Sequence, residues 1–494
     1  MTKTQKQKIV LIAGVSAVWW ILSLFTEPLV FQTALRPSVL PRYILVRLLC
    51  LGAMTLTVAY LYRLIGGLLK KDRNLAVRTT LYAVPVWILL FGYCAVRDMS
   101  LGGEELNIIE AATHYDLMNA VFTYITSYIE MIMMMMVPST DAPQIMKILL
   151  LGLDVGYAAA RTAEIYRTRF APMVLYLGMI VPPAVRDSCS IHRCPMYGML
   201  YFFLAAKLFC DWKEGKKLNR RDILISAALM AVLTWWRAEG IYFLALGPVL
   251  LLLTYRIRPG KRTTAGLLAA FYLLQLLVWL PKTAAPELNI ENYGKHQLTP
   301  FYNYALTGML CTGLDREKNA EDLETIEPYM HIDFIDILYD LYGEHIFDEG
   351  HATYHESYTA VNPDATEEML DAYEAAVRHL ILKNPLLFIR AQIRAFHHIS
   401  AHYDGLCLSA VFGNLWLVVL WLLGILAHCV VKKKWAVLTL TLCPICHGCI
   451  STIFLPAAYF KYYYPEYLFA WLFLGFALSS VIARTVAKRK GLPQ

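Results

Sequence analysis

Charge is scarce in this chain. Of its 494 residues only 17% are Asp, Glu, Lys or Arg, whereas 58% are hydrophobic and 13% are aromatic. The sequence has no P-loop, no glycine-rich dinucleotide fingerprint and no basic-aromatic surface, which argues against a cytoplasmic nucleotide-dependent enzyme and against a nucleic-acid partner. It has no Asn-x-Ser/Thr acceptor site, so nothing indicates a glycoprotein of a eukaryotic lumen. This composition exceeds what one soluble core can bury, and a bilayer is the expected solvent.

Cysteine offers no obvious framework either. The 11 cysteines are scattered, mostly inside apolar runs, where we expect small packing residues. Cys189 and Cys194 are the exception because they share the short loop "RDSCSIHRCP". They would pair if that loop faces an oxidising compartment.

Long apolar runs predict an all-α polytopic protein of the plasma membrane with about twelve transmembrane helices. The short loops are basic, for example "KKDR" at 70–73 and "KEGKKLNRR" at 213–221, which predicts that they and both termini are cytoplasmic. The predicted spans are 9–26, 43–69, 79–96, 144–160, 171–186, 195–211, 222–236, 240–255, 264–281, 406–430, 435–455 and 463–485.

Five regions follow from this topology. Spans occupy 1–96, hairpins of spans 144–281, and the last spans with a basic tail 406–494. Two segments, 97–143 and 282–405, are predicted to lie outside the cell, and the second holds 21 of the 38 acidic residues but only 8 of the 45 basic ones. We expect this second segment to be mostly helical.

Helical patterns also appear within the two outer segments. Residues 117–138 carry Glu130, so they are predicted to lie on the outer membrane surface rather than to cross. A short helix over 106–115 would place Asn107, Glu110 and His114 on one face and rest Leu106, Ile109 and Ala112 on lipid. Further along, Asn362 and Pro363 predict a helix start, and "PLLFIRAQIRAFHHI" predicts a juxtamembrane helix.

Carboxylates gather just after the third predicted span, in "RDMSLGGEELNIIEAATHYD". The acidic residues there are Asp98, Glu104, Glu105, Glu110 and Asp116, and they can be read simply as a solvated acidic loop. Other predicted outer turns supply cations that can be read as anchors at the interface. These residues are Arg186 and Arg193, with Asp187 beside them, then Arg237 and Lys461. Together the two sets suit a substrate that carries a phosphate at the membrane surface and a proton to be removed.

Several of these stretches resemble the GT-C superfamily of integral-membrane glycosyltransferases, which includes protein O-mannosyltransferases and bacterial aminoarabinose transferases. "GGEELNIIEAATHYD" is similar to its acidic-pair stretch, with Glu104 and Glu105 where an Asp-Glu pair is usual. "WWRAEGIYFLALGPVLLL" resembles its Arg-x-x-Gly hairpin, "KNPLLFIRAQI" its proline-containing amphipathic helix, and "YFKYYYPEYL", with Lys461 and Tyr462, its last outer turn. The resemblance covers roughly residues 79–485, although two additional spans precede the acidic pair.

The resemblance implies transfer of a sugar from a polyprenyl-phosphate donor to a glycan, lipid or protein acceptor on the outer face. A phosphate leaving group needs charge neutralisation rather than a proton, so one general base is enough. Glu104, or failing it Asp98, would deprotonate the acceptor hydroxyl, and attack would invert the anomeric carbon. Glu105 and Asp187 would orient the acceptor or hold a divalent cation. The donor phosphate and its surroundings would be held by Arg237, Arg186, Arg193, Lys461, Tyr462, Glu110 and His114.

Two other functions stay open. A polymerase or ligase of lipid-linked glycans would use a similar large outer segment, and a transporter or flippase of lipid-linked saccharides would place its charged groups deeper, within broken helices. The haem-attachment pattern "CPICH" at 443–447 lies inside a predicted span, and His351 with His355 does not match a zinc spacing, so neither indicates a cofactor.

Overall fold

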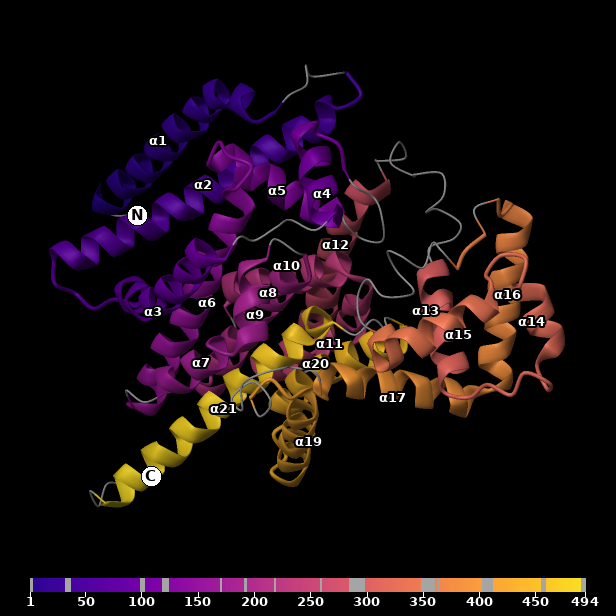
Figure 1. Cartoon of the computed structure of the whole chain (residues 1–494). Coiled ribbons are helices and arrows are strands. Elements are labelled where there is room, and N and C mark those ends of the chain that lie inside the picture. The colour runs from indigo at the N-terminus through magenta and orange to yellow at the C-terminus, as the bar shows by residue number, and fades with distance from the viewer. Residues whose placement is uncertain are drawn as a thin grey trace. The chain divides into compact units, whose positions relative to one another are not determined.

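The structure is a computed structural model that describes residues 3–31, 37–97, 103–117, 124–168, 171–190, 193–216, 219–257, 260–283, 298–347, 360–362, 364–401, 412–454 and 459–489. Throughout these ranges the elements are helices, as predicted (Figure 1). In the part of the chain that the structure describes, six stretches are long and apolar enough to cross a membrane: Gln5–Leu29, Leu40–Leu69, Leu75–Val96, Arg262–Pro281, Trp435–Phe454 and Phe460–Val486. The helices are therefore compatible with a membrane protein, whereas the full set of twelve spans stays a prediction.

The chain divides into two compact units. The first comprises Met1–Ile290, Ile425–Cys443 and Leu468–Gln494. Its helices are α1 (Lys3–Thr26), η1 (Glu27–Leu29), α2 (Leu40–Leu69), α3 (Leu75–Val96), α4 (Gly103–Thr113), α5 (Tyr124–Met136), α6 (Ala142–Tyr166), α7 (Ala171–Met179), α8 (Pro182–Cys189), α9 (Arg193–Lys213), α10 (Arg220–Trp236), η2 (Ala238–Tyr242), α11 (Phe243–Thr254) and α12 (Lys261–Thr283).

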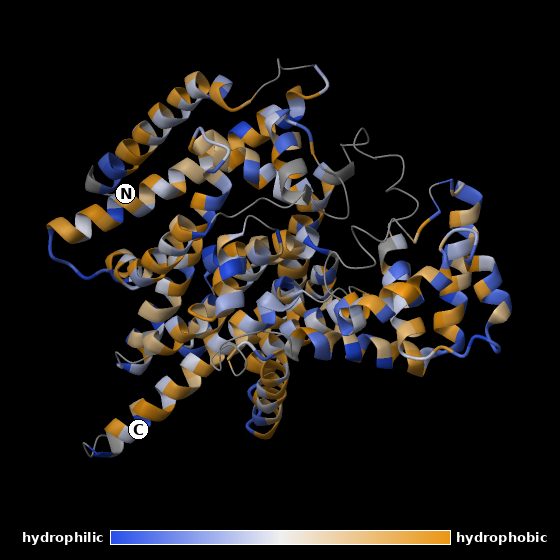
Figure 2. Cartoon of the chain, viewed as in Figure 1, coloured by the Kyte–Doolittle hydropathy of each residue, from blue (hydrophilic) through white to orange (hydrophobic). Residues whose placement is uncertain are grey.

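The second unit comprises Glu291–Gly424 and Pro444–Tyr467. It holds α13 (Thr299–Cys311), α14 (Ala320–Ile326), α15 (Ile332–Tyr342), η4 (Gly343–Phe347), α16 (Glu367–Lys383) and α17 (Pro385–Ala401). These pack around a core that includes Leu306, Ile326 and Tyr373, so the segment has the hydrophobic centre of a folded domain. Three apolar helices are shared between the units: α19 (Leu415–Val431), α20 (Trp435–Phe454) and α21 (Phe460–Arg489). Figure 2 shows hydrophobic residues along α1 and α19.

The predicted single span 171–186 is wrong as a continuous helix. The chain forms α7 with 9 residues and α8 with 8 residues, separated at Ile180 and Val181. Pro182 and Pro183 explain the break, because a proline disfavours helical geometry in the residue before it. Most side chains of α8 are buried by protein, which is where a broken helix is tolerated at membrane depth.

In the first outer segment the structure has the two short helices that the sequence predicts. At 13 residues α5 extends about 20 Å, less than the hydrocarbon thickness. The prediction that α4 rests Ile109 and Ala112 on lipid is wrong, because both side chains are buried, 6% and 0% exposed. Since α4 packs against α5, protein rather than lipid covers this apolar face.

One prediction about a single position is also wrong. Thr366, not Asn362, caps α16, and its hydroxyl accepts a hydrogen bond from Met369 N. The Asn362 side chain instead donates to Pro328 O at 3.0 Å and so holds the loop before the helix, while Pro363 lies outside the described residues. The sequence leaves open whether Cys189 and Cys194 pair. In the structure both are free, and the Cys189 thiol lies 3.5 Å from Leu90 O.

The predicted juxtamembrane helix is found as α17. Leu386, Ile389 and Ile393 are exposed along one side, while Phe388 and Ala391 are buried against the domain core. This amphipathic pattern agrees with a helix that lies on a membrane, although its position there stays a prediction.

Candidate functional site

The first part of the site lies where α8 meets α6. Asp187 on α8 is buried, and its backbone carbonyl accepts a hydrogen bond from Lys147 Nζ of α6 at 3.2 Å. Arg186 Nε lies 3.4 Å from Asp187 Oδ1, while most of the Arg186 side chain is exposed. The Lys147 side chain is 0% exposed. The structure therefore keeps two predicted site residues together and adds a buried lysine that the sequence analysis missed.

The second part is built where α10 passes into η2. Arg237 is 5% exposed, and its Nε donates to both carboxylate oxygens of Glu239 at 3.1 Å. A terminal guanidinium nitrogen also contacts Glu239, and another contacts the Cys194 thiol at the start of α9. This two-point geometry fixes the plane of the guanidinium. Glu239 was also missed, although "RAEG" places it two residues from the predicted arginine.

These two parts belong to one stretch of structure. Asp187 near the end of α8 is separated by only a few residues from Arg193 and Cys194 at the start of α9. The Tyr197 hydroxyl of α9 lies 3.1 Å from the Tyr242 hydroxyl of η2, which ties the same elements together. We call the set the α8–η2 cluster, and its charged members are Lys147, Arg186, Asp187, Arg193, Arg237 and Glu239. Its four basic and two acidic side chains leave a formal surplus of two positive charges.

The helix that carries the acidic stretch, α4, is connected to the α8–η2 cluster through the packing of α5. Glu104 and Glu105 stand in the first turns of α4, but their side chains and the whole of Asp98 lie outside the described residues. The helix α4 packs against α5, which in turn packs against α6 and α10. Glu110 is exposed and His114 is half-buried. Proximity of the carboxylates to Arg237 thus stays a prediction, although α5 contacts both α4 and the helix that ends next to Arg237.

The end of α4 is anchored to the first two helices. The Tyr115 carbonyl accepts a hydrogen bond from Arg42 Nη1 at 3.3 Å, and the Tyr115 ring stacks on Phe31 with centroids 4.6 Å apart. The Tyr115 hydroxyl also contacts Glu27, which pairs with Arg47 of α2. These contacts fix the position of the C-terminal end of α4 relative to α1 and α2.

Lys461 and Tyr462 belong to the second unit. Lys461 Nζ lies 4.3 Å from the centre of the Tyr459 ring and 5.6 Å from that of Tyr462, a cation–π arrangement. Nearby in the sequence, His447 Nδ1 lies 2.6 Å from Glu466 Oε1, and both side chains are buried. His447 belongs to the "CPICH" stretch, which was considered only as a haem-attachment pattern, and this pair was therefore missed. A joint role of Lys461 with Arg237 stays a prediction.

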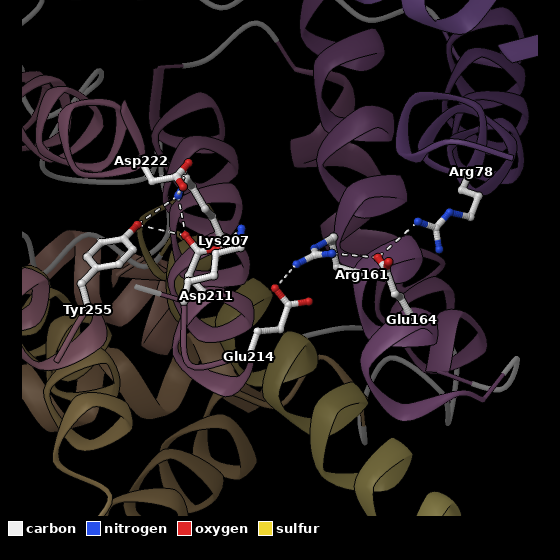
Figure 3. A network of polar contacts seen from close by, with 9 residues as sticks. Arg78, Arg161, Glu164, Lys207, Asp211, Glu214, Asp222 and Tyr255 are labelled. Carbon is white, nitrogen blue, oxygen red and sulfur yellow. Dashed lines mark hydrogen bonds and ion pairs between the residues drawn. The ribbon is translucent and has the colours of Figure 1, made fainter. Parts of the chain in front are cut away.

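Two further groups of polar contacts, also missed, lie at the ends of α3, α6, α9 and α10 that carry basic loops (Figure 3). Glu164 Oε2 lies 3.2 Å from Arg78 and 2.7 Å from Arg161, whose other nitrogen reaches Glu214 at 2.5 Å. Separately, the fully buried Asp211 pairs with Lys207 at 2.5 Å and with Lys216 at 2.6 Å, and it accepts a hydrogen bond from Tyr255. Lys207 and Asp211, four residues apart on α9, were the available signal.

Within the described residues, no group of three or more His, Cys, Asp or Glu side chains is arranged to hold a metal ion. A cation held by Glu105 and Asp187 stays a prediction, since the Glu105 side chain is outside the description. Comparison of the chain with protein-family models, with curated proteins and with solved structures finds no match. Fold and site together thus define a helical protein with helices long and apolar enough to cross a membrane and with a partly buried, net-basic polar cluster.

Proposed function

We propose that the protein transfers a sugar from a polyprenyl-phosphate donor to an acceptor on the extracytoplasmic face of the plasma membrane. The single observation that carries this proposal is the α8–η2 cluster, in which Arg237 is buried and held by Glu239 within a region of surplus positive charge. Buried charges are costly unless they are paired or functional. A donor phosphate is an anion that such a basic cluster would attract.

The chemistry assigns a different role to each part. Arg237, Arg186, Arg193 and Lys147 would neutralise the phosphate as it leaves, because charge that develops in the transition state is best stabilised by donors already in place. Glu104 on α4 would remove the proton from the acceptor hydroxyl, and Glu105 would orient that acceptor. The acceptor oxygen then bonds to the anomeric carbon as the bond from that carbon to the phosphate oxygen breaks, which inverts the configuration.

The direct test incubates the purified full-length chain with a panel of labelled polyprenyl-phosphate sugars and candidate glycan, lipid and protein acceptors, and it measures the polyprenyl phosphate released. We expect Glu104→Gln to lower the rate by about 10²- to 10⁴-fold, the range for a general base. Arg237→Gln should lower it as well, with partial recovery in Arg237→Lys. Glu317→Gln, on an exposed turn of the second unit, is the matched control and should keep the wild-type rate. Full activity of the Glu104 variant would remove the proposed base and would favour a polymerase or ligase that relies on arginines.

A transporter or flippase of lipid-linked saccharides is the second candidate, and one observation favours it. The His447–Glu466 pair is buried within α20 and α21, both of which are long and apolar enough to cross a membrane. Ionisable groups in such helices often mark a translocation path. Liposomes that contain the protein and a labelled lipid-linked sugar separate the two functions: movement of the intact lipid between leaflets, without sugar release, would establish the transporter.

A further inference from the structure

A cavity of about 240 Å³ lies between α3 and α6, outside the cluster assigned to sugar transfer. It is lined by Arg78 and Tyr82 of α3 and by Ala160, Ala163, Glu164, Arg167 and Thr168 on or just after α6. Its size is below that of most drug-like ligand sites, so it suits a small polar group. The question is which group these walls fit.

The packing of α3 against α6 explains why a cavity opens here. Glycines bring the two helices together, because a Cβ at Gly156 would lie 2.2 Å from Thr79 O and one at Gly152 would lie 2.1 Å from Trp87 Nε1. Trp87 Nε1 also donates to Leu149 O at 3.1 Å. One turn beyond Gly156 the α6 residues are alanines, and then come the long side chains of Glu164 and Arg167. The side chains of Glu164 and Arg167 cannot approach α3 as closely as the glycines do, and a gap is left between them and Arg78.

The walls of this cavity are positively charged. Arg78 and Arg161 share the Glu164 carboxylate, and Arg161 also pairs with Glu214 (Figure 3). Among the residues that line the cavity, Arg78 and Arg167 are basic and Glu164 is acidic, which leaves a surplus of one positive charge. The Arg78 Nε atom is buried and has no hydrogen-bond partner among the described residues. A buried donor without a partner is costly, and an acceptor in the cavity would remove that cost.

The position of the cavity indicates the source of such an acceptor. Arg78 is in the first turn of α3, a helix long and apolar enough to cross a membrane, and it follows the basic stretch "KKDR". The cavity is therefore at the end of a candidate span, and if α3 crosses the membrane, lipid headgroups would lie at this level. Basic pockets between membrane helices bind anionic headgroups, and arginine forks match phosphate oxygens.

We propose that this cavity binds the phosphodiester headgroup of an anionic phospholipid. Arg78 and Arg167 hold the phosphate oxygens, and Tyr82 and Thr168 contact the glycerol side of the headgroup. The bound lipid fills the gap below the α3–α6 crossing and holds the two helix ends together. This role is independent of sugar transfer, since its residues are not those of the α8–η2 cluster.

The test uses the full-length chain in mild detergent, titrated with phosphatidylglycerol or phosphatidylcholine and followed by native mass spectrometry. We expect one tightly retained phosphatidylglycerol per chain, bound about tenfold more strongly than phosphatidylcholine. Arg167→Gln should remove most of that preference, because it deletes the surplus charge without breaking any ion pair among the described residues. Arg220→Gln, an exposed arginine at the start of α10, makes the same charge change elsewhere and should bind like the wild type.

Three results would overturn the proposal: equal retention of the two lipids, unchanged binding in Arg167→Gln, or an equal loss in Arg220→Gln. A second arm adds inorganic phosphate at millimolar concentration. If free phosphate binds the cavity as tightly as phosphatidylglycerol does and displaces it, the cavity is a site for soluble phosphate and not for a lipid. Arg78→Lys is a control for misfolding, because it keeps a positive charge beside Glu164. We expect this variant to bind the lipid more weakly than the wild type and more strongly than Arg78→Gln.

Discussion

Gly240 gives a physical reason for the Arg-x-x-Gly pattern at residues 237–240. A Cβ at this position would lie 2.1 Å from Leu233 O, so any side chain would push η2 away from the last turn of α10. The Gly240 amide instead donates to Arg237 O at 3.0 Å and closes the turn. That turn folds Glu239 back onto the guanidinium of Arg237. The motif therefore supplies Arg237 and, through the turn at Gly240, also fixes the orientation of its guanidinium group.

Tyr373 supports a prediction about the folded domain of the second unit. Its side chain is 0% exposed and its hydroxyl donates to Asn303 Oδ1 at 2.6 Å. Tyr373→Phe should cost about 1 kcal/mol at pH 7.5, the usual net value of one hydrogen bond. Burial also raises the pKa of Tyr373 well above its ordinary value. Its contribution to stability is thus complete below the unfolded pKa of about 10 and is lost as the pH rises beyond it.

The measurement is pulse proteolysis of the full-length chain in urea, with cleavage inside the domain as the readout, at pH 7.5 and pH 10.5. The difference between wild type and Tyr373→Phe should shrink at the higher pH, because ionisation of Tyr373 lowers the stability of the wild type alone, whereas the other tyrosines ionise in both proteins. Tyr272→Phe, in the first unit and exposed, should change neither value. A difference that grows with pH would contradict the burial argument.

Sequence reasoning identified Arg237 and Asp187 because they follow apolar runs, where a charge is conspicuous. Lys147 and Glu239 were missed for a physical reason. Lys147 sits within an apolar run and looks like a residue that reaches for the interface, and only the packing of α8 on α6 shows that its amine meets a carbonyl. Glu239 becomes meaningful only once the 3₁₀ turn directs it back to Arg237.

At the scale of helices, the α3–α6 crossing depends on glycine. Gly156→Ala should destabilise the chain by about 1–3 kcal/mol, the usual cost of overpacking, because the new Cβ would lie 2.2 Å from Thr79 O. Gly92→Ala on α3 is the matched control, since nothing lies within 4 Å of its added Cβ. A fluorescence-detected thermal shift of the detergent-solubilised chain should show a lower melting temperature for the first variant only. Equal melting temperatures would contradict the observed close approach.

Helix positions were largely predictable, whereas helix ends and breaks were not. Apolar runs gave α1, α2, α3, α12, α20 and α21 to within a few residues at most ends. The break between α7 and α8 depends on Pro182 and Pro183, which the apolar pattern alone did not weigh. The start of α16 was placed at Asn362 because that residue often caps helices, but its side chain is engaged by Pro328 O and Thr366 takes the cap.

At the scale of the whole molecule, the chain is strongly asymmetric in charge. Residues 282–405 are rich in acids, while the short loops between apolar helices are basic. Basic short loops are retained in the cytoplasm, whereas long segments cross largely regardless of charge. This asymmetry underlies the predicted orientation, and through it the prediction that the acidic α4 and the α8–η2 cluster face the outside.

The break at α7 and α8 makes that orientation testable in one experiment. If the two helices together cross the membrane, the loop at 213–221 is cytoplasmic; if they do not, the count of crossings changes and that loop faces outward. Lys318→Cys, Arg220→Cys and Lys432→Cys can each be labelled in intact cells with an impermeant maleimide and located by peptide mapping. We expect Lys318→Cys to react in intact cells and the other two only after lysis. Reaction of Arg220→Cys in intact cells would show an odd number of crossings between a cytoplasmic N-terminus and residue 220, as expected if α7 and α8 form no crossing. The sugar-transfer cluster, which follows α7, would then face the side opposite to the one proposed, whereas the lipid cavity precedes α7 and would keep its side.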